Sequence, residues 1–184
     1  LVEVAQSPDD AVRNVGTPSE TPPALARMDP DIHIDLRTDK GGDGAVYFVG
    51  EKIKISVRSD RAGFLRLYYV QSDNTVVRLV PSHYTPDDRI EPGREYAFPS
   101  GTDRYDLKIL PQPLGKEQIV AVVSSVPFDD NEISIAELGN FDVLKDGIPA
   151  VDQSIRFKGL GIIPTDAVYN RASITITTMV KSEL

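Results

Sequence analysis

The fold of this chain is decided by the stretch Gly63-Phe64-Leu65-Arg66-Leu67-Tyr68-Tyr69-Val70-Gln71. Its aliphatic and aromatic residues are typical of a strand that crosses a core, with Leu65, Leu67 and Tyr69 on one face. A turn composition follows at Ser72-Asp73-Asn74-Thr75, and strand composition returns at Val76-Val77-Arg78-Leu79-Val80-Pro81. The two runs therefore predict a β-hairpin, with Leu67 buried mid-strand.

Apolar residues with a period of two lie on both sides of this hairpin, and each such run predicts a further strand. The runs contain Ile32, Ile34 and Leu36; Ile53, Ile55 and Val57; residues 94–99; Tyr105, Leu107 and Ile109; residues 117–125; and residues 172–180. The run 117–125 is apolar on both faces, which is typical of a central strand.

These strands, separated by turn signals, predict a mainly β fold: an immunoglobulin-like antiparallel β-sandwich. A Pro-rich arm or linker covers residues 1–30, and a single domain covers 31–184, with its core in 46–126 and its final strand at 172–180. Between them, 127–171 is expected to be a helical or loop insertion. Within it, Asp129-Asp130-Asn131-Glu132 is expected to cap a short helix through Leu138, with Gly139 as the stop.

Composition excludes several classes of function. The 28 acidic and 20 basic residues give a net charge of -8, which opposes the phosphate contacts that nucleic-acid binding requires. The chain has no Cys, so it has neither a disulfide scaffold nor a cysteine nucleophile. No apolar run has the length of a membrane span. Nucleic acid is therefore not an expected partner, and no transmembrane segment is expected in this chain.

Metal ligands are few in the sequence. Asp39-Lys40-Gly41-Gly42-Asp43-Gly44 resembles a calcium loop, but an EF-hand needs oxygen ligands at positions three and twelve, where this chain has Gly41 and Gly50. A zinc site would have only His33 and His83 as nitrogen ligands. The sequence therefore predicts no metal and no cofactor.

The long polar loop after Pro81 is the candidate interaction site. It brings together a hydroxyl, an imidazole, a phenol and charged groups, at Ser82, His83, Tyr84, Asp87, Asp88 and Arg89. Adjacent Ser82 and His83 on extended backbone point to opposite sides, which is poor geometry for a nucleophile and its base. Paired carboxylates for glycoside hydrolysis remain open, because Asp and Glu are plentiful.

A series of short motifs between Val46 and Val126 resembles a known family. They are Tyr47-x-x-Gly50-Glu51, the central run from Gly63 to Val70, Leu79-Val80-Pro81-Ser82, Ile90-x-Pro92-Gly93, Phe98-Pro99 and Gly115-Lys116-Glu117-Gln118-Ile119-Val120-Ala121. In order and spacing they resemble the bacterial family catalogued as domain of unknown function 4384. The resemblance implies a β-sandwich module of exported or multidomain bacterial proteins, with no established catalytic residues. It also implies a periplasmic or extracellular location, with a membrane anchor before Leu1 as one option.

Three functions follow as expectations. The first is a non-catalytic protein-interaction or assembly module of an exported bacterial protein, whose partner is another protein. The alternative is a glycan or cell-wall binding module, which the absence of Trp disfavours because a sugar-stacking surface loses its strongest candidate. The second alternative is a hydrolase that uses the 82–89 loop.

Overall fold

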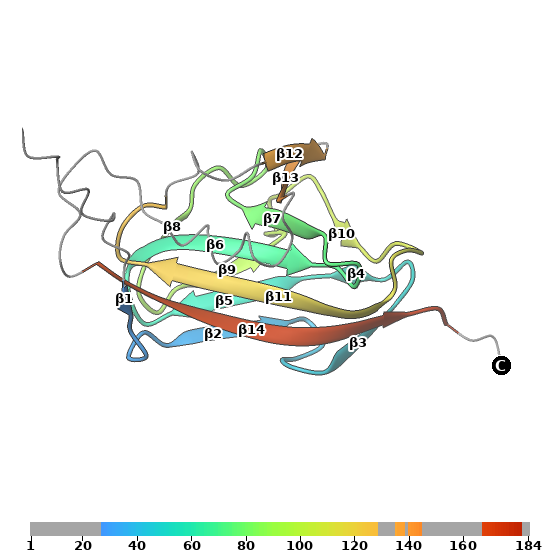
Figure 1. Cartoon of the computed structure of the whole chain (residues 1–184), viewed down its shortest axis with the longest axis horizontal. Helices are drawn as coiled ribbons and strands as arrows, with labels where there is room; N and C mark the ends of the chain where they lie inside the picture. Colours follow the sequence, from blue (N-terminus) through green and yellow to red (C-terminus); the bar gives the residue numbers. More distant parts are fainter. Residues whose placement is uncertain (1–26, 129–134, 139, 145–166, 182–184) are drawn as a thin grey trace, which may run out of the picture.

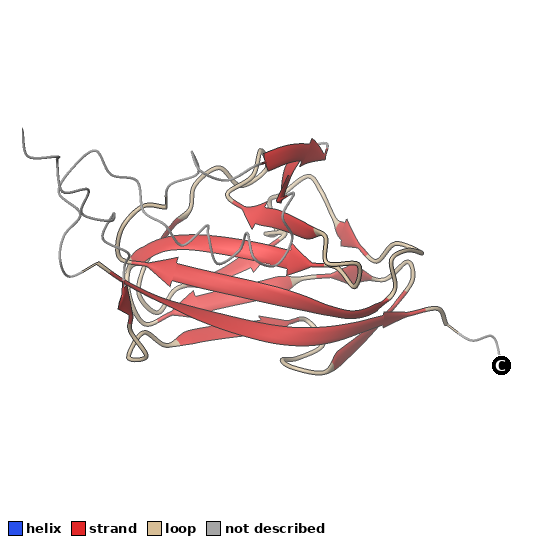
Figure 2. Ribbon diagram, in the orientation of Figure 1, coloured by secondary structure: helices blue, strands red, loops and turns tan. Residues whose placement is uncertain are grey.

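The structure is a computed structural model that describes residues 27–128, 135–138, 140–144 and 167–181. Every regular element in these residues is a β-strand (Figures 1 and 2). The strands are β1 Arg27–Met28, β2 Ile34–Thr38, β3 Ala45–Phe48, β4 Lys52–Ile53, β5 Ile55–Ser59, β6 Gly63–Val70, β7 Val76–Val80, β8 Arg89–Ile90, β9 Glu95–Phe98, β10 Leu107–Lys108, β11 Gly115–Ser124, β12 Ile135–Leu138, β13 Phe141–Leu144 and β14 Val168–Met179. The mainly β class predicted from the sequence is confirmed.

The strands form one large and two small sheets. The large sheet has the order β1-β14-β11-β6-β7-β13-β12, with β3 also beside β14 and β8 beside β6. The small sheets have the orders β2-β5-β9 and β10-β4. Figure 1 shows the long strands β6, β11 and β14 side by side in the large sheet.

One hydrophobic core joins the large sheet to the small sheets. Leu65 and Leu67 of β6 and Ile119 of β11 pack in the same cluster as Ile55 and Val57 of β5, and all five are at most 1% exposed. Side chains at alternate positions of each strand point to the same face, so the core takes every second residue of β6 and β11. The buried position predicted for Leu67 is confirmed.

The opposite face of β6 and β11 is also covered. Tyr68, Val120 and Val122 form a second buried cluster with Phe128 and Leu144. The sequence predicts that β11 is a central strand because it is apolar on both faces. The structure confirms this prediction, since β11 lies between β6 and β14 inside the sheet.

The predicted hairpin is confirmed at β6 and β7. The two strands are antiparallel, Val70 is opposite Val76, and the chain turns through residues 71–75. Asn74 has a φ of 67°, a conformation that Asn tolerates better than most residues. The register shifts between Leu67, which is opposite Val80, and Tyr68, which is opposite Arg78, so Leu79 is an extra residue in β7.

The predicted helix at 129–138 is wrong where the structure describes it. Ile135–Leu138 is strand β12, which pairs with β13 in antiparallel register from Ile135↔Leu144 to Leu138↔Phe141. In the sequence, Gly139-Asn140 stands between the paired Leu138 and Phe141, and Gly-Asn is a hairpin signal; Gly139 lies outside the described residues. The same glycine also fits a helix stop, which is the role predicted for it from the sequence. Residues 129–134 lie outside the described residues.

The expected antiparallel pairing is wrong at the β14 edge of the large sheet. Both β1 and β3 pair with β14 in parallel, so the sheet is mixed. Parallel pairing is available here because β14 follows β1 and β3 after long stretches of chain, and no short hairpin sets its direction. Residues 1–26 of the predicted arm lie outside the described residues, as do 129–134, 139 and 145–166 of the predicted insertion.

Candidate functional site

A cleft of about 330 Å³ opens between the inner face of the large sheet and the segment that contains β10. Its walls are mostly aliphatic and aromatic. They come from β6 and β7, from residues 106–113 and from β13, and include Tyr69, Val77, Leu79, Ile109, Leu110 and Phe141. Apolar clefts with a few polar groups are the common form of ligand site in proteins, and this volume lies near the lower end of their range.

The segment from β10 to β11 is held by hydrogen bonds near both ends. Near the start, the amide of Ile109 donates to the carbonyl of Glu51 and the amide of Gly50 donates to the carbonyl of Ile109, both at 2.9 Å. Near the end, the hydroxyl of Ser72 donates to the carbonyl of Leu114 at 3.1 Å. Ile109 therefore points into the core, whereas the next side chain, Leu110, is 62% exposed at the rim of the cleft.

A buried carboxyl group lines this apolar cleft. Glu117 on β11 is 3% exposed and shares its strand face with Ile119 and Ala121 of the core. The hydroxyl of Tyr69 on β6 donates a hydrogen bond to its Oε2. Burial of a carboxylate is costly unless hydrogen bonds or a cation compensate it. The Tyr69 hydroxyl supplies part of that compensation.

The surroundings set the protonation of both groups. Burial raises the pKa of Glu117 above its ordinary value, while hydrogen bonds from Tyr69, from the backbone of Ser72 and from Thr178 act in the opposite direction. Burial raises the pKa of Tyr69 as well, and the adjacent Glu117 raises it further. Tyr69 therefore keeps its proton and remains the donor of the pair.

Within the described part of the chain, only neutral groups offset the cost of burying the Glu117 carboxylate. The ion pairs of the described residues do not include it, and the nearby rim carboxylate Asp106 pairs outward with Lys52 at 2.8 Å. Both side chains of this pair are at least 60% exposed, so the pair contributes little to stability. The cleft thus combines apolar walls with one buried, acidic group.

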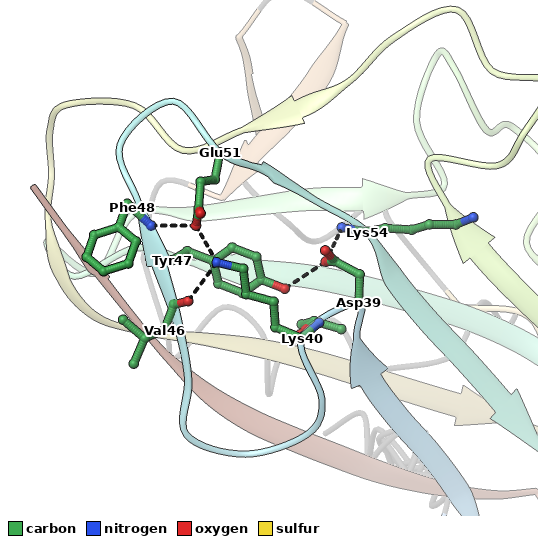
Figure 3. A network of polar contacts seen from close by, with 8 residues as sticks. Asp39, Lys40, Val46, Tyr47, Phe48, Glu51 and Lys54 are labelled. Atoms are coloured by element: carbon green, nitrogen blue, oxygen red, sulfur yellow. Dashed lines mark hydrogen bonds and ion pairs between the residues drawn. The ribbon is translucent and has the colours of Figure 1, made fainter. Parts of the chain in front are cut away.

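A second polar network fixes the loop between β2 and β4 (Figure 3). Asp39 accepts hydrogen bonds from the Tyr47 hydroxyl at 2.7 Å and the Lys54 amide at 3.0 Å. Lys40 pairs with Glu51 and donates to the carbonyl of Val46 at 3.1 Å. Burial is the main cause that raises the pKa of Tyr47 to about 12. This network stabilises the loop conformation.

The carboxylates of the loop 39–44, which resembles a calcium loop in sequence, accept hydrogen bonds from other parts of the chain. An oxygen of Asp39 is used by Tyr47 and Lys54, and Asp43 accepts from the amide of Thr175 at 2.7 Å. Across the described residues, no group of three or more His, Cys, Asp and Glu side chains is arranged to hold a metal ion.

The first half of the predicted interaction loop lies beside β13. Ser82 is buried, and its hydroxyl accepts from the amide of Thr85 at 3.2 Å. Tyr84 stacks on Tyr105 with a centroid distance of 4.4 Å, and its hydroxyl accepts from the side chain of Asn140 at 2.7 Å. The exposed ring of His83 meets Tyr84 edge-on at 6.0 Å. Ser82 is therefore a turn residue.

The second half of the loop lies at β8, where it joins β6. The carboxylate of Asp88 pairs with the buried guanidinium of Arg66 at 2.6 Å, and the Asp88 carbonyl accepts from the Leu65 amide at 2.7 Å. Asp87 accepts from the amide of Arg89 at 3.0 Å, and the Arg89 guanidinium lies 5.5 Å from the ring centroid of Phe64. The six predicted residues thus divide between two places on the large sheet.

One connection joins the predicted loop to the cleft. Phe141, which lines the cleft, lies 5.3 Å from Tyr84 and 5.8 Å from Tyr105 between ring centroids. The aromatic cluster of Tyr84, Tyr105 and Phe141 therefore borders the cleft.

Sequence analysis missed the two central polar residues of the cleft. Glu117 and Tyr69 were recognised only as parts of strands. The signal that could have identified Glu117 is its position at the start of the inward series Glu117, Ile119, Ala121 and Val123, where a charged residue is unexpected.

The comparisons agree with the resemblance seen in the sequence. Residues 46–127 match the model of the family described as "Domain of unknown function (DUF4384)", so the predicted family is confirmed for this part of the chain. No curated protein and no solved structure matches the chain. Within the described residues, no helix is long and apolar enough to cross a membrane.

Proposed function

We propose that this chain is a non-catalytic protein-interaction or assembly module of an exported bacterial protein, and that the cleft beneath residues 106–113 is its binding site. The observation that carries the proposal is the apolar cleft of about 330 Å³ lined by a buried Glu117–Tyr69 pair. An exposed apolar side chain, Leu110, stands at the rim, where a partner would cover it. The exported location is supported by the family resemblance of residues 46–127.

Binding fits this site better than catalysis. Tyr69 holds its proton because its pKa is raised, and its hydroxyl is committed to Glu117. The hydrolase alternative uses the 82–89 loop, in which the Ser82 hydroxyl is buried in a turn with Thr85. A nucleophile must instead be exposed and hydrogen-bonded to a base. We therefore retain the interaction function and place its contact surface at the cleft.

The glycan-binding alternative is favoured by one observation. Tyr84 is 38% exposed and stacks on Tyr105, so an aromatic surface is available beside the cleft. Aromatic rings can support a sugar face, although this cluster contains no Trp. The immunoglobulin-like sandwich architecture, which many binding modules share, stays a prediction.

A peptide selection tests the proposed function. A displayed library of random peptides is selected on the immobilised chain, and the affinity of the enriched peptides is measured by calorimetry for three proteins: the parent, Leu110→Asp and Val180→Asp. Leu110 is 62% exposed at the cleft and Val180 is 63% exposed beyond β14, so the two substitutions differ in location and match in exposure.

We expect Leu110→Asp to weaken the binding of the enriched peptides at least about tenfold and Val180→Asp to leave it unchanged, since an apolar contact of the cleft is lost only in the first. A glycan array probed in parallel examines the alternative. Oligosaccharide binding that Tyr84→Ala abolishes, together with no peptide enrichment, would replace the interaction function by the glycan-binding one.

A further inference from the structure

We infer that the cleft takes a basic side chain, lysine or arginine, from the partner protein, with its head group against Glu117 and its methylene stem against the apolar walls. The inference rests on the proposed function and adds the chemistry of the occupant.

The first argument is charge complementarity. Glu117 is 3% exposed, and within the described part of the chain it accepts a hydrogen bond from the phenol of Tyr69 and is paired with no Lys or Arg. A carboxylate away from water is stabilised far more by a cation than by neutral donors. A ligand that brings a cation into this cleft supplies a group that the described residues do not place beside Glu117.

The second argument is the composition of the walls. Val77, Leu79 and Ile109 provide aliphatic contacts, and Phe141 provides an aromatic one. Lysine and arginine side chains place methylene groups along such surfaces and carry the charge at the tip. A purely apolar side chain would fit the walls but would leave Glu117 without a cation, whereas an acidic side chain would be repelled by Glu117.

The third argument is the size and the charge of the surroundings. A cleft of about 330 Å³ lies at the small end of ligand sites, so it suits one long side chain better than a large ligand. Asp106 stands at the rim and the chain carries a net charge of -8, so a basic segment is also attracted from a distance. Lys108, which also lines the cleft, is the opposing charge at the rim.

Single-residue probes test the inference independently of any selected peptide. The probes are the N-acetyl, N-methylamide derivatives of lysine, arginine and norleucine, where norleucine keeps the stem of lysine and removes the charge. Each is titrated into the isotope-labelled chain at millimolar concentration, and NMR follows the amides of residues 107–112 and the side-chain carboxyl carbon of Glu117.

The lysine or arginine probe should bind at least about tenfold more tightly than the norleucine probe, because hydrogen bonds to charged groups are stronger than neutral contacts. Glu117→Gln, which preserves shape and removes the charge, should abolish that preference. Glu91→Gln, which removes an exposed carboxylate that does not line the cleft, should retain the preference. Thermal melting of each variant confirms that it is folded.

Equal binding of the lysine and norleucine probes would overturn the inference, as would a preference that survives Glu117→Gln or an absence of shifts with both basic probes. Enriched peptides that bind at the cleft without a basic residue would also overturn it while leaving the proposed function in place. Failure of the proposed function would instead appear as an absence of peptides sensitive to Leu110→Asp.

Discussion

The hydroxyl of Tyr69 on β6 donates to the carboxylate of Glu117 on β11, one strand away in the same sheet. The register places Tyr69 opposite Ile119, so Glu117 reaches its partner diagonally, two residues along β11. Diagonal neighbours in a sheet are within reach of long side chains such as these. The pair therefore depends on the β6–β11 register and binds the two central strands to each other.

Removal of the Tyr69 hydroxyl should destabilise the chain. Tyr69→Phe leaves a buried carboxylate with one donor fewer, so we expect the free energy of unfolding to fall by about 1–3 kcal/mol. Urea denaturation measures the change. Tyr96→Phe is the matched control, because the Tyr96 hydroxyl accepts an exposed hydrogen bond from the amide of Glu91. A loss for Tyr69→Phe no larger than that of the control would contradict the importance of the pair.

The raised pKa of Glu117 makes a prediction about pH. Its folded pKa lies above the ordinary value of 4.5, so the folded chain binds this proton more tightly than the unfolded chain. The stabilising contribution is complete below the ordinary pKa and is lost as the pH rises through the folded pKa. The stability of the parent relative to Glu117→Gln should therefore increase as the pH falls from neutral towards 4.5.

A comparison of the two proteins by urea denaturation at several pH values isolates this effect. Carboxylates with lowered pKa values, such as Glu51 and Asp73, lose their stabilising contribution on acidification in both proteins, so they cancel in the difference. If the stability difference between the parent and Glu117→Gln stays constant with pH, or falls on acidification, the pKa of Glu117 is not raised.

Much of the central sheet could be predicted from the sequence because its signals are local. The β6–β7 hairpin has two apolar runs and a turn between them, and β11 has apolar residues on both faces. β8 has two residues, which is too short for a period to be seen, and it falls in the stretch predicted as a polar loop. The hairpin of β12 and β13 was not predicted, because the sequence Gly139-Asn140 is typical both of the end of a helix and of a hairpin turn.

The candidate site could not be predicted in the same way because its parts are distant in sequence. Tyr69 and Glu117 are 48 residues apart and meet only through the β6–β11 register. The cleft also needs Phe141 of β13 and the segment around Leu110, which non-local pairing brings together. The polar composition of the 82–89 loop predicted an interaction site there. In the structure, Ser82 stabilises a turn and Asp88 pairs with Arg66 of β6.

Truncation in the core should have a larger effect than truncation at the cleft rim. Leu67 is fully buried and packs between the sheets, so Leu67→Ala should lower the free energy of unfolding by about 2–5 kcal/mol. Leu110→Ala, at a 62% exposed position, should change it by less than about 0.5 kcal/mol. Thermal and urea denaturation give both values. Similar losses for the two variants would show that the face assignment of β6 is wrong.

Close approach of two strand ends makes Gly63 difficult to replace. A Cβ atom built at Gly63 would lie 2.3 Å from the carbonyl oxygen of Ser124 and 3.1 Å from its carbonyl carbon. Backbone atoms of the central strand β11 cannot move aside as a flexible side chain would, so β6 and β11 would have to separate at this end. We expect Gly63→Ala to lower the free energy of unfolding by about 1–3 kcal/mol, as other overpacked sites do.

The control for this substitution is Gly101→Ala, because a Cβ at Gly101 meets no atom within 4 Å. Hydrogen exchange adds a local measurement: amides where β6 pairs with β11 near Phe64 and Ser124 should exchange faster in Gly63→Ala than in the parent. The amides near the β6–β7 turn should keep their relative protection, since the clash is at the other end of β6. Equal stability and exchange for both glycine variants would show that the strand ends are farther apart than the structure places them.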